Sequence, residues 1–232
     1  MPGLFECIIW FLGSFLEAAV VVCSISKGSF RRYIALNLYM GASCIFSIAR
    51  YKILVSYGFN STEYFYFYYY SDALLTIALF FTLISLYSLV LDELKAERYV
   101  RLGAILLLAG TALFSYLVIQ QSSQRLLTHF VVELSQNLYF VGLILTYVLW
   151  GAIMKLRETR ARLVQLVLSV GLYFSALAAN YALRNLYPQL HMIWVYLPPL
   201  LGCLLPLAWA YTFWRLPEDA RLAPARLAVV PR

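Results

Sequence analysis

The sequence predicts an all-α membrane protein, a polytopic bundle of seven transmembrane helices, and three observations support this class. Hydrophobic residues make up 63% of the 232 residues, charged residues only 12%, and the mean hydropathy is +0.77. A soluble domain has roughly half apolar and a quarter charged residues. The apolar residues also fall in uninterrupted runs of about 20, which suit membrane helices, whereas a transmembrane strand needs about 10 alternating residues.

Seven such runs are expected to be the transmembrane spans, at about 4–24, 33–56, 66–91, 100–120, 130–154, 163–185 and 192–214. The connections between them are too short to hold a soluble domain. We therefore expect residues 1–214 to form a single bundle. Residues 215–232 carry three prolines among Ala and Arg, which predicts a polar, disordered cytoplasmic tail.

The basic residues predict the orientation of the bundle. Fourteen of the 18 Lys and Arg residues fall in loops one, three and five and in the tail. Basic residues in short loops stay in the cytoplasm, so we expect the N-terminus outside and the C-terminus inside. No basic residue precedes the first run, which argues against a cleaved signal peptide. The net charge of +7 is then mostly topogenic, and we expect no nucleic-acid partner.

Several chemistries lack their parts in this sequence. The patterns HExxH, CxxC and GxSxG are absent, and the last run, 192–214, has no Lys for a retinal Schiff base. Both histidines fall at the outer edge of the bundle rather than in pairs within it, which argues against haem. We therefore expect no enzyme activity, no metal and no cofactor.

Polar residues gather at similar depth near the outer ends of four predicted helices. On the fifth run, His129, Glu133 and Asn137 recur every four residues and share one helical face. The simpler alternative is that the arginines reach to the headgroups and Glu133 caps a helix. The mixture of charge signs favours an outward-facing cavity that binds a small polar or zwitterionic ligand, lined by Arg50, Asp72, His129, Glu133, Asn137, Asn180, Arg184 and Tyr196.

Two expectations concern individual charges. Arg50 is predicted to lie within about 4 Å of Asp72 or Glu133, because an ion pair offsets the cost of burying each charge. Glu17 is the deepest acid of the first run. It is expected to be a buried acid that is either neutral and hydrogen-bonded inside the bundle or paired with a cation from the cytoplasmic side.

Three further patterns bear on packing and on the cavity. The aromatic run 64–70 predicts either an interfacial belt or the aromatic wall of a site open to the outside. Gly171, Ser175 and Ala179 form a small-residue seam, which predicts a close approach by a neighbouring helix. A kink in the last span is expected from its three prolines, Pro198, Pro199 and Pro206.

Short motifs along nearly the whole chain resemble one protein family. They are Leu16-Glu17, Ala49-Arg50-Tyr51, Glu63-Tyr64-Phe65-Tyr66, Ser71-Asp72, Glu133-Leu134-Ser135, Trp209-Ala210-Tyr211 and Pro217-Glu218. In these motifs the chain is similar to a group of uncharacterised seven-helix integral membrane proteins recurrent in acidobacterial genomes. The resemblance implies the same fold and a bacterial cytoplasmic (inner) membrane, and it implies no particular activity.

Two classes of function remain open from the sequence. A receptor-like or scaffolding protein would sense a small polar ligand and act through a cytoplasmic or membrane protein partner, because the loops contain no output domain. The alternative is a small-solute transporter or channel, although carriers more often show internal repeats or paired broken helices. An intramembrane enzyme would need a nucleophile or a metal set that the sequence lacks. The one partner that every alternative shares is the lipid bilayer.

Overall fold

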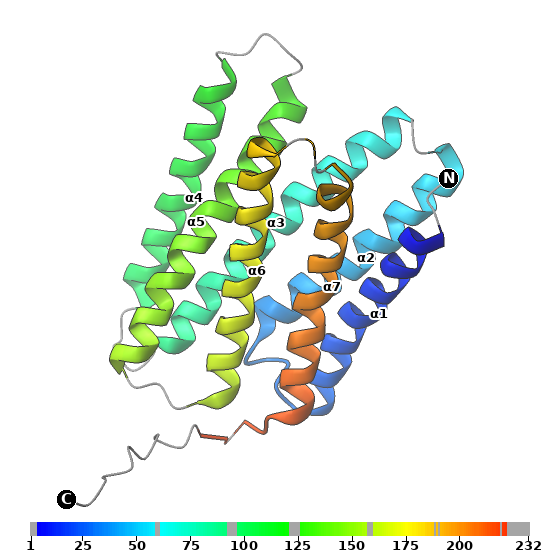
Figure 1. The fold of residues 1–232 in the computed structure, drawn as a ribbon. Helices are drawn as coiled ribbons and strands as arrows, with labels where there is room; N and C mark the ends of the chain where they lie inside the picture. The colour runs from blue at the N-terminus through cyan, green and yellow to red at the C-terminus, as the bar shows by residue number, and fades with distance from the viewer. Residues whose placement is uncertain are drawn as a thin grey trace, which may run out of the picture.

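The chain folds into seven α-helices in a computed structural model (Figure 1). The structure describes residues 4–58, 61–91, 97–120, 126–156, 160–187, 189, 191–218 and 220–221, and some side chains in α1 and α4–α7 lie outside this description. The predicted number of helices is confirmed. Their bounds are α1 Leu4–Ser26, α2 Ile34–Tyr57, α3 Thr62–Val90, α4 Glu97–Gln120, α5 Leu126–Leu156, α6 Ala161–Leu186 and α7 His191–Arg215.

Six of the helices form a closed ring, and the seventh packs outside it. Around the ring, each helix contacts the next in the order α1, α2, α3, α5, α6, α7, and α7 returns to α1. Helix α4 lies against the outer side of α5 and touches α3, as Figure 1 shows on the left of the bundle. The ring order therefore differs from the chain order at one point, between α3 and α5.

Six helices contain segments long and apolar enough to cross a membrane, which indicates a multi-pass membrane protein. Found among the described residues, they are Cys7–Ser26, Ile34–Tyr57, Thr62–Val90, Glu133–Met154, Ala161–Arg184 and Leu197–Arg215. The outer surface of these helices carries large apolar side chains, as expected for a surface that contacts lipid. A membrane crossing by α4 stays a prediction.

Helix α3 begins earlier than the sequence predicts, at Thr62 rather than 66. The reason is a side-chain cap: Ser61 Oγ accepts a hydrogen bond from the backbone N–H of Tyr64 at 3.1 Å. Such a cap satisfies one of the free N–H groups of the first turn. The whole aromatic run 64–70 is consequently helical, and its rings point in several directions around α3.

Helices α5 and α6 approach each other closely at two glycines. A Cβ atom on Gly171 of α6 would lie 2.5 Å from Thr146 and 2.6 Å from Trp150 of α5, and one on Gly142 of α5 would lie 2.6 Å from Phe174. No side chain fits at these distances without moving its neighbours. The predicted close approach at Gly171 is thus observed.

An apolar core fills the half of the ring that is lower in Figure 1. Eight of these side chains have no exposed surface: Val20, Leu83, Leu149, Leu166, Val167, Val170, Trp209 and Phe213. They come from α1, α3, α5, α6 and α7, so the core joins most of the ring. This half of the bundle ends at the α1–α2 connection and at the start of α6.

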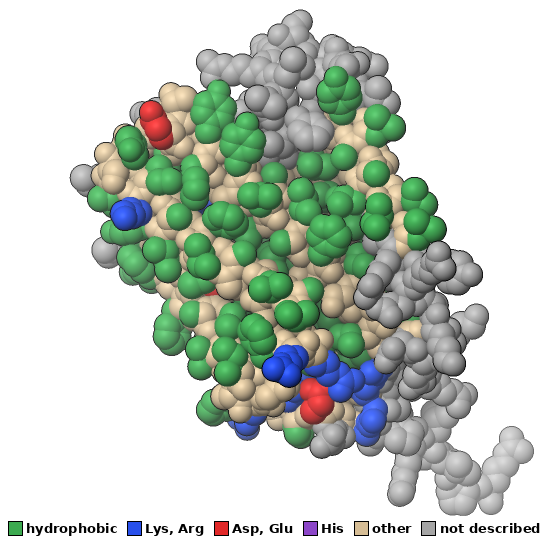
Figure 2. All heavy atoms as spheres, turned by 180° about the vertical axis from the view of Figure 1, so that it is seen from behind, with side chains coloured by type: hydrophobic (Ala, Val, Ile, Leu, Met, Phe, Trp, Pro, Cys, Tyr) green, Lys and Arg blue, Asp and Glu red, His purple; other side chains and the backbone are tan. Residues whose placement is uncertain are grey.

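Polar side chains at this end form a set of contacts that we call the basic-end network: Ser29, Arg32, Tyr33, Arg162 and Glu218. Arg162 is only 2% exposed, and its Nη1 contacts both Ser29 Oγ and Glu218 Oε2. The other carboxylate oxygen of Glu218 lies 2.8 Å from Arg32 Nη1. Burial, and then the Glu218 charge, raises the pKa of Tyr33 to about 12. Figure 2 shows Lys and Arg gathered around an acidic side chain at this end.

The start of the C-terminal tail belongs to the bundle, which corrects the expectation of disorder from residue 215 onward. Arg162 Nε donates to the carbonyl of Leu216 at 2.9 Å, and the backbone N–H of Ala161 donates to the carbonyl of Ala220 at 3.0 Å. A bridge pairs Arg160 with Arg221. The buried Arg162 bonds to the Leu216 carbonyl because a guanidinium has five donors to satisfy. The remaining tail, 222–232, lies outside the described residues.

Candidate functional site

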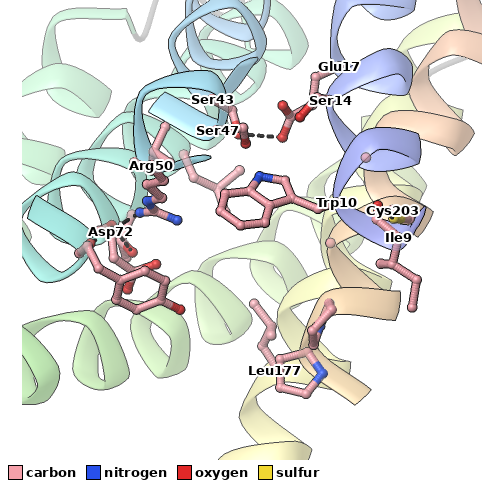
Figure 3. A pocket seen from close by; sticks show the side chains of 18 of the residues that line it. Ile9, Trp10, Ser14, Glu17, Ser43, Ser47, Arg50, Asp72, Leu177 and Cys203 are labelled. Carbon is pink, nitrogen blue, oxygen red and sulfur yellow. Dashed lines mark hydrogen bonds between the residues drawn. The ribbon is translucent and has the colours of Figure 1, made fainter. Parts of the chain in front are cut away.

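A cavity of about 500 Å³ occupies the other half of the ring, above the apolar core. All six ring helices contribute to its wall (Figure 3). Its polar and aromatic lining residues are Trp10, Ser14, Glu17, Tyr39, Ser43, Ser47, Arg50, Tyr64, Tyr68, Asp72, Thr76, Tyr139 and Tyr173. The size lies within the range of small-molecule sites, but the lining is more polar than that of an ordinary apolar pocket.

Glu17 of α1 lies on the cavity wall near the middle of its helix. Ser43 Oγ of α2 donates a hydrogen bond to Glu17 Oε1 at 2.5 Å, the bond drawn in Figure 3. Oε2 is buried and has no hydrogen-bond partner within the described part of the chain. Of the two expectations for this acid, the structure matches hydrogen bonding inside the bundle, since no cation pairs with it there.

Arg50 of α2 is held by α3 through neutral groups. Its Nε donates to Ser71 Oγ at 2.7 Å, and its Nη2 donates to the carbonyl of Tyr68 at 3.2 Å. The guanidinium also lies 4.5 Å from the centre of the Tyr68 ring, a cation–π contact. These contacts fix the side chain at the cavity wall.

The predicted ion pair of Arg50 with Asp72 or Glu133 is wrong. Among the described side chains, no Arg50 nitrogen lies within 4.0 Å of either carboxylate. Ser71 and the Tyr68 carbonyl already accept hydrogen bonds from Arg50. Asp72 follows Ser71 directly in α3, so its side chain leaves the helix in a different direction. Arg50 and Asp72 still line one cavity from neighbouring helices, as Figure 3 shows.

Several polar groups of the cavity have no hydrogen-bond partner among the residues that the structure describes. In the described part of the chain, no hydrogen bond is found for the Tyr39 hydroxyl, the Ser14 and Ser47 hydroxyls or the Asp72 carboxylate, although all four residues line the cavity. Tyr39 is only 8% exposed. A buried polar group without a partner costs about 1–3 kcal/mol. Water or a bound solute is therefore required to satisfy this wall.

Four further predicted site residues that the structure describes, Glu133, Asn137, Asn180 and Arg184, do not line the cavity. Asn137 Nδ2 donates instead to Ser115 Oγ of α4 at 3.0 Å, and Arg184 is exposed. Asn180 is buried, and its Oδ1 has no hydrogen-bond partner among the described residues, while Glu133 is half-buried. For the two α5 residues the physical reason is the ring order, because α4 covers the face of α5 that was expected to look into the bundle. The side chains of His129 and Tyr196 lie outside the described residues.

Sequence reasoning missed most of the hydroxyl groups of this site. Ser43, Ser47 and Arg50 recur on α2 at i, i+4 and i+7, a spacing that places them on one face and that is readable from the sequence. The aromatic run divides between the cavity and the outer surface. Tyr64 and Tyr68 line the cavity, whereas Tyr66 and Tyr70 are 42% and 45% exposed.

The prolines of α7 lie against the same space. Pro198, Pro199 and Gly202 line the cavity, and Pro206 falls one turn after Gly202. Because Pro206 has no N–H, the Gly202 carbonyl cannot receive the usual helical hydrogen bond. The backbone of α7 therefore offers a carbonyl acceptor near the cavity, in addition to the side chains.

The fold and the site define a class: a multi-pass helical membrane protein with an internal cavity of polar and charged groups. Among the described residues, no cluster of three or more His, Cys, Asp or Glu side chains is arranged to hold a metal ion. Comparison with protein-family models, curated proteins and solved structures finds no match to this chain. The functional argument therefore depends on the cavity itself.

Proposed function

We propose that this chain is a receptor-like membrane protein that binds a small polar or zwitterionic solute in the ring cavity and acts through a protein partner. The supporting observation is a cavity of about 500 Å³ that holds Glu17, Asp72 and Arg50 together with several hydroxyls for which no hydrogen bond is found among the described residues. A site with fixed polar groups discriminates strongly against molecules that cannot satisfy them. The apolar core closes the ring on the basic-end side of the cavity. A solute in the cavity can therefore enter and leave only from the opposite side of the bundle.

The proposed orientation places the N-terminus outside and the basic end in the cytoplasm, as basic loops favour. The cavity then lies in the extracytoplasmic half of the bundle. A reporter fused after Arg232 is expected to behave as cytoplasmic and one inserted after Ser61 as extracytoplasmic. The reverse pattern would move the site to the cytoplasmic side. The bacterial inner membrane and the resemblance to the seven-helix family likewise stay predictions.

Cysteine labelling tests the cavity directly. In a background without the native cysteines, Ser47→Cys is expected to react with a charged, membrane-impermeant thiol reagent added outside. The matched control is Thr212→Cys, because Thr212 has no exposed surface in the apolar half. Reaction of Ser47→Cys that slows in the presence of a solute supports binding. Equal protection of both positions, unchanged by any solute, would contradict the proposal.

A small-solute transporter or channel is the second candidate, favoured by the proline-interrupted helix α7 beside the cavity. Transport would need the apolar core around Trp209 to open, since it closes the ring. Uptake of a bound solute into liposomes containing the protein would favour this alternative. Binding without uptake would favour the receptor-like function.

A further inference from the structure

We infer that the part of the cavity at Glu17 is a binding subsite for an ammonium group, so that the ligand is an organic amine. This inference rests on the proposed function and names its ligand class. The starting observation is Glu17 Oε2, a buried carboxylate oxygen on the cavity wall with no hydrogen-bond partner in the described part of the chain. An ammonium cation, including a quaternary one, supplies the positive charge that compensates this unpaired buried carboxylate oxygen.

Acceptors and negative charge predominate in the cavity. Glu17 and Asp72 both line it, and neither forms an ion pair with a cation among the described residues. Arg50 is the one described cation in the lining, and two of its donors are already held by Ser71 and the Tyr68 carbonyl. A cation bound beside these acids favours their ionised forms. In that state the wall carries one negative charge in excess, which a cationic or zwitterionic occupant balances.

Aromatic rings surround this negative region. Tyr39 of α2 lines the same cavity as Glu17, Asp72 and Tyr173. Tyr139 and Tyr173 line the wall on the opposite helices, α5 and α6. Ammonium groups bind favourably over aromatic faces, and the binding is stronger where water is excluded. Carboxylates and tyrosines around a small space form the kind of cage that recognises such cations.

Arg50 lies at a different level of α2 from the residue that bonds to Glu17. Ser43, which bonds to Glu17, precedes Arg50 by seven residues, and a helix rises 1.5 Å per residue, so the two backbone levels differ by about 10 Å. In Figure 3, Glu17 lies near Ser43, and Arg50 lies beside Asp72. A small ammonium group can therefore occupy the Glu17 level without meeting the guanidinium.

The test is equilibrium binding of choline chloride to the full chain in lipid nanodiscs. The matched neutral probe is 3,3-dimethylbutan-1-ol, which has the shape of choline without its charge. We expect saturable binding of choline and at least tenfold weaker binding of the alcohol. Glu17→Gln keeps an acceptor for Ser43 but removes the charge, and is expected to weaken choline binding at least tenfold. Glu63→Gln, at an exposed position at the start of α3, is the control and should leave binding unchanged.

Glu17→Asp guards against a folding defect in the first variant, because it keeps the charge and is expected to retain part of the affinity. Equal binding of choline and the alcohol, or unchanged choline binding in Glu17→Gln, would overturn the inference. Displacement of choline by NaCl, but not by a matched concentration of N-methyl-glucamine chloride, would assign the subsite to a metal cation and also overturn it. If choline fails to bind while another solute protects Ser47→Cys, the proposed function stands and the amine subsite does not.

Discussion

The two halves of the same helical ring surround their charged side chains differently. At the basic end, Arg162 is 2% exposed and its donors are taken by Glu218, Ser29 and the Leu216 carbonyl. In the cavity, Glu17 Oε2 is also buried, yet no described group pairs with it. Both halves use the same helices. The buried charge of Arg162 is thus compensated within the protein, whereas Glu17 keeps one oxygen without a described partner at the cavity wall.

A pair of tryptophans gives the largest expected contrast between the halves. Trp209 has no exposed surface in the apolar core, whereas Trp10 is part of the cavity wall. Trp209→Ala is expected to cost about 3–5 kcal/mol of unfolding free energy, because the packed core cannot refill the space. Trp10→Ala should cost less than about 2 kcal/mol, since it only enlarges an existing cavity. SDS titration of both variants in micelles measures these values, and equal losses would remove the contrast.

The second expected effect concerns the basic-end network. Glu218→Ala leaves the buried Arg162 without its carboxylate and is expected to cost about 3 kcal/mol. This is the lower end for a broken buried pair, because the Glu218 side chain keeps 31% exposure. Glu63→Ala at an exposed position serves as the control, with an expected change under about 0.5 kcal/mol. A loss below about 1 kcal/mol for Glu218→Ala would mean that the network contributes little.

The pH dependence of stability tests the burial of Tyr33 in the basic-end network. The pKa of Tyr33 is raised from 10.0 to about 12, so between these values the folded protein holds a proton that the unfolded chain releases. Stability from Tyr33 is therefore fully present below pH 10 and is lost as the pH rises toward 12, by about 2 kcal/mol. Tyr33→Phe should show a flatter decline over this interval in denaturant titrations at successive pH values. Parallel curves for the two proteins would contradict the burial of this phenol.

Two helical glycines give the smallest expected effects, with opposite signs. Gly171→Ala should destabilise by about 1–3 kcal/mol, because its Cβ would meet Thr146 and Trp150 at under 3 Å. Gly202→Ala should stabilise by up to about 1 kcal/mol, since nothing lies within 4 Å of its Cβ and Ala favours a helix. Melting temperatures of both variants in one detergent provide the comparison. A destabilised Gly202→Ala would indicate that the cavity wall is tighter than its lining suggests.

The sequence was sufficient for the helices but not for their arrangement. Apolar runs set the seven elements, because each must cover its own backbone in lipid. The ring order depends on side-chain packing between distant segments, so nothing local indicated that α4 lies outside and takes Asn137 through Ser115. The position of α4 accounts for the two α5 residues, Glu133 and Asn137, whereas nothing in the sequence indicated which face of α6 looks into the ring.

Within the site, charge was the readable signal. Arg50 and Asp72 stand out because ionisable groups are rare inside membrane spans, and both line the cavity. Tyr39 and Ser47 resemble ordinary helix residues in the sequence. They stand out only in the structure, where they line the cavity and no hydrogen bond is found for their hydroxyls among the described residues.

The contact between α1 and α7 joins the first and last helices of the chain and closes the ring. During synthesis, six helices enter the membrane before this seam can form. Until then Ile9 and Cys203, which meet at the seam through a 3.6 Å contact from the thiol to the carbonyl, belong to separate surfaces, and the Glu17 carboxylate faces an open side. Glu218 follows directly after α7 and engages Arg162 in the same final step. The cavity and the basic-end network are thus completed together by the last stretch of the chain. A product truncated before α7 has neither and is distinguishable from the finished protein.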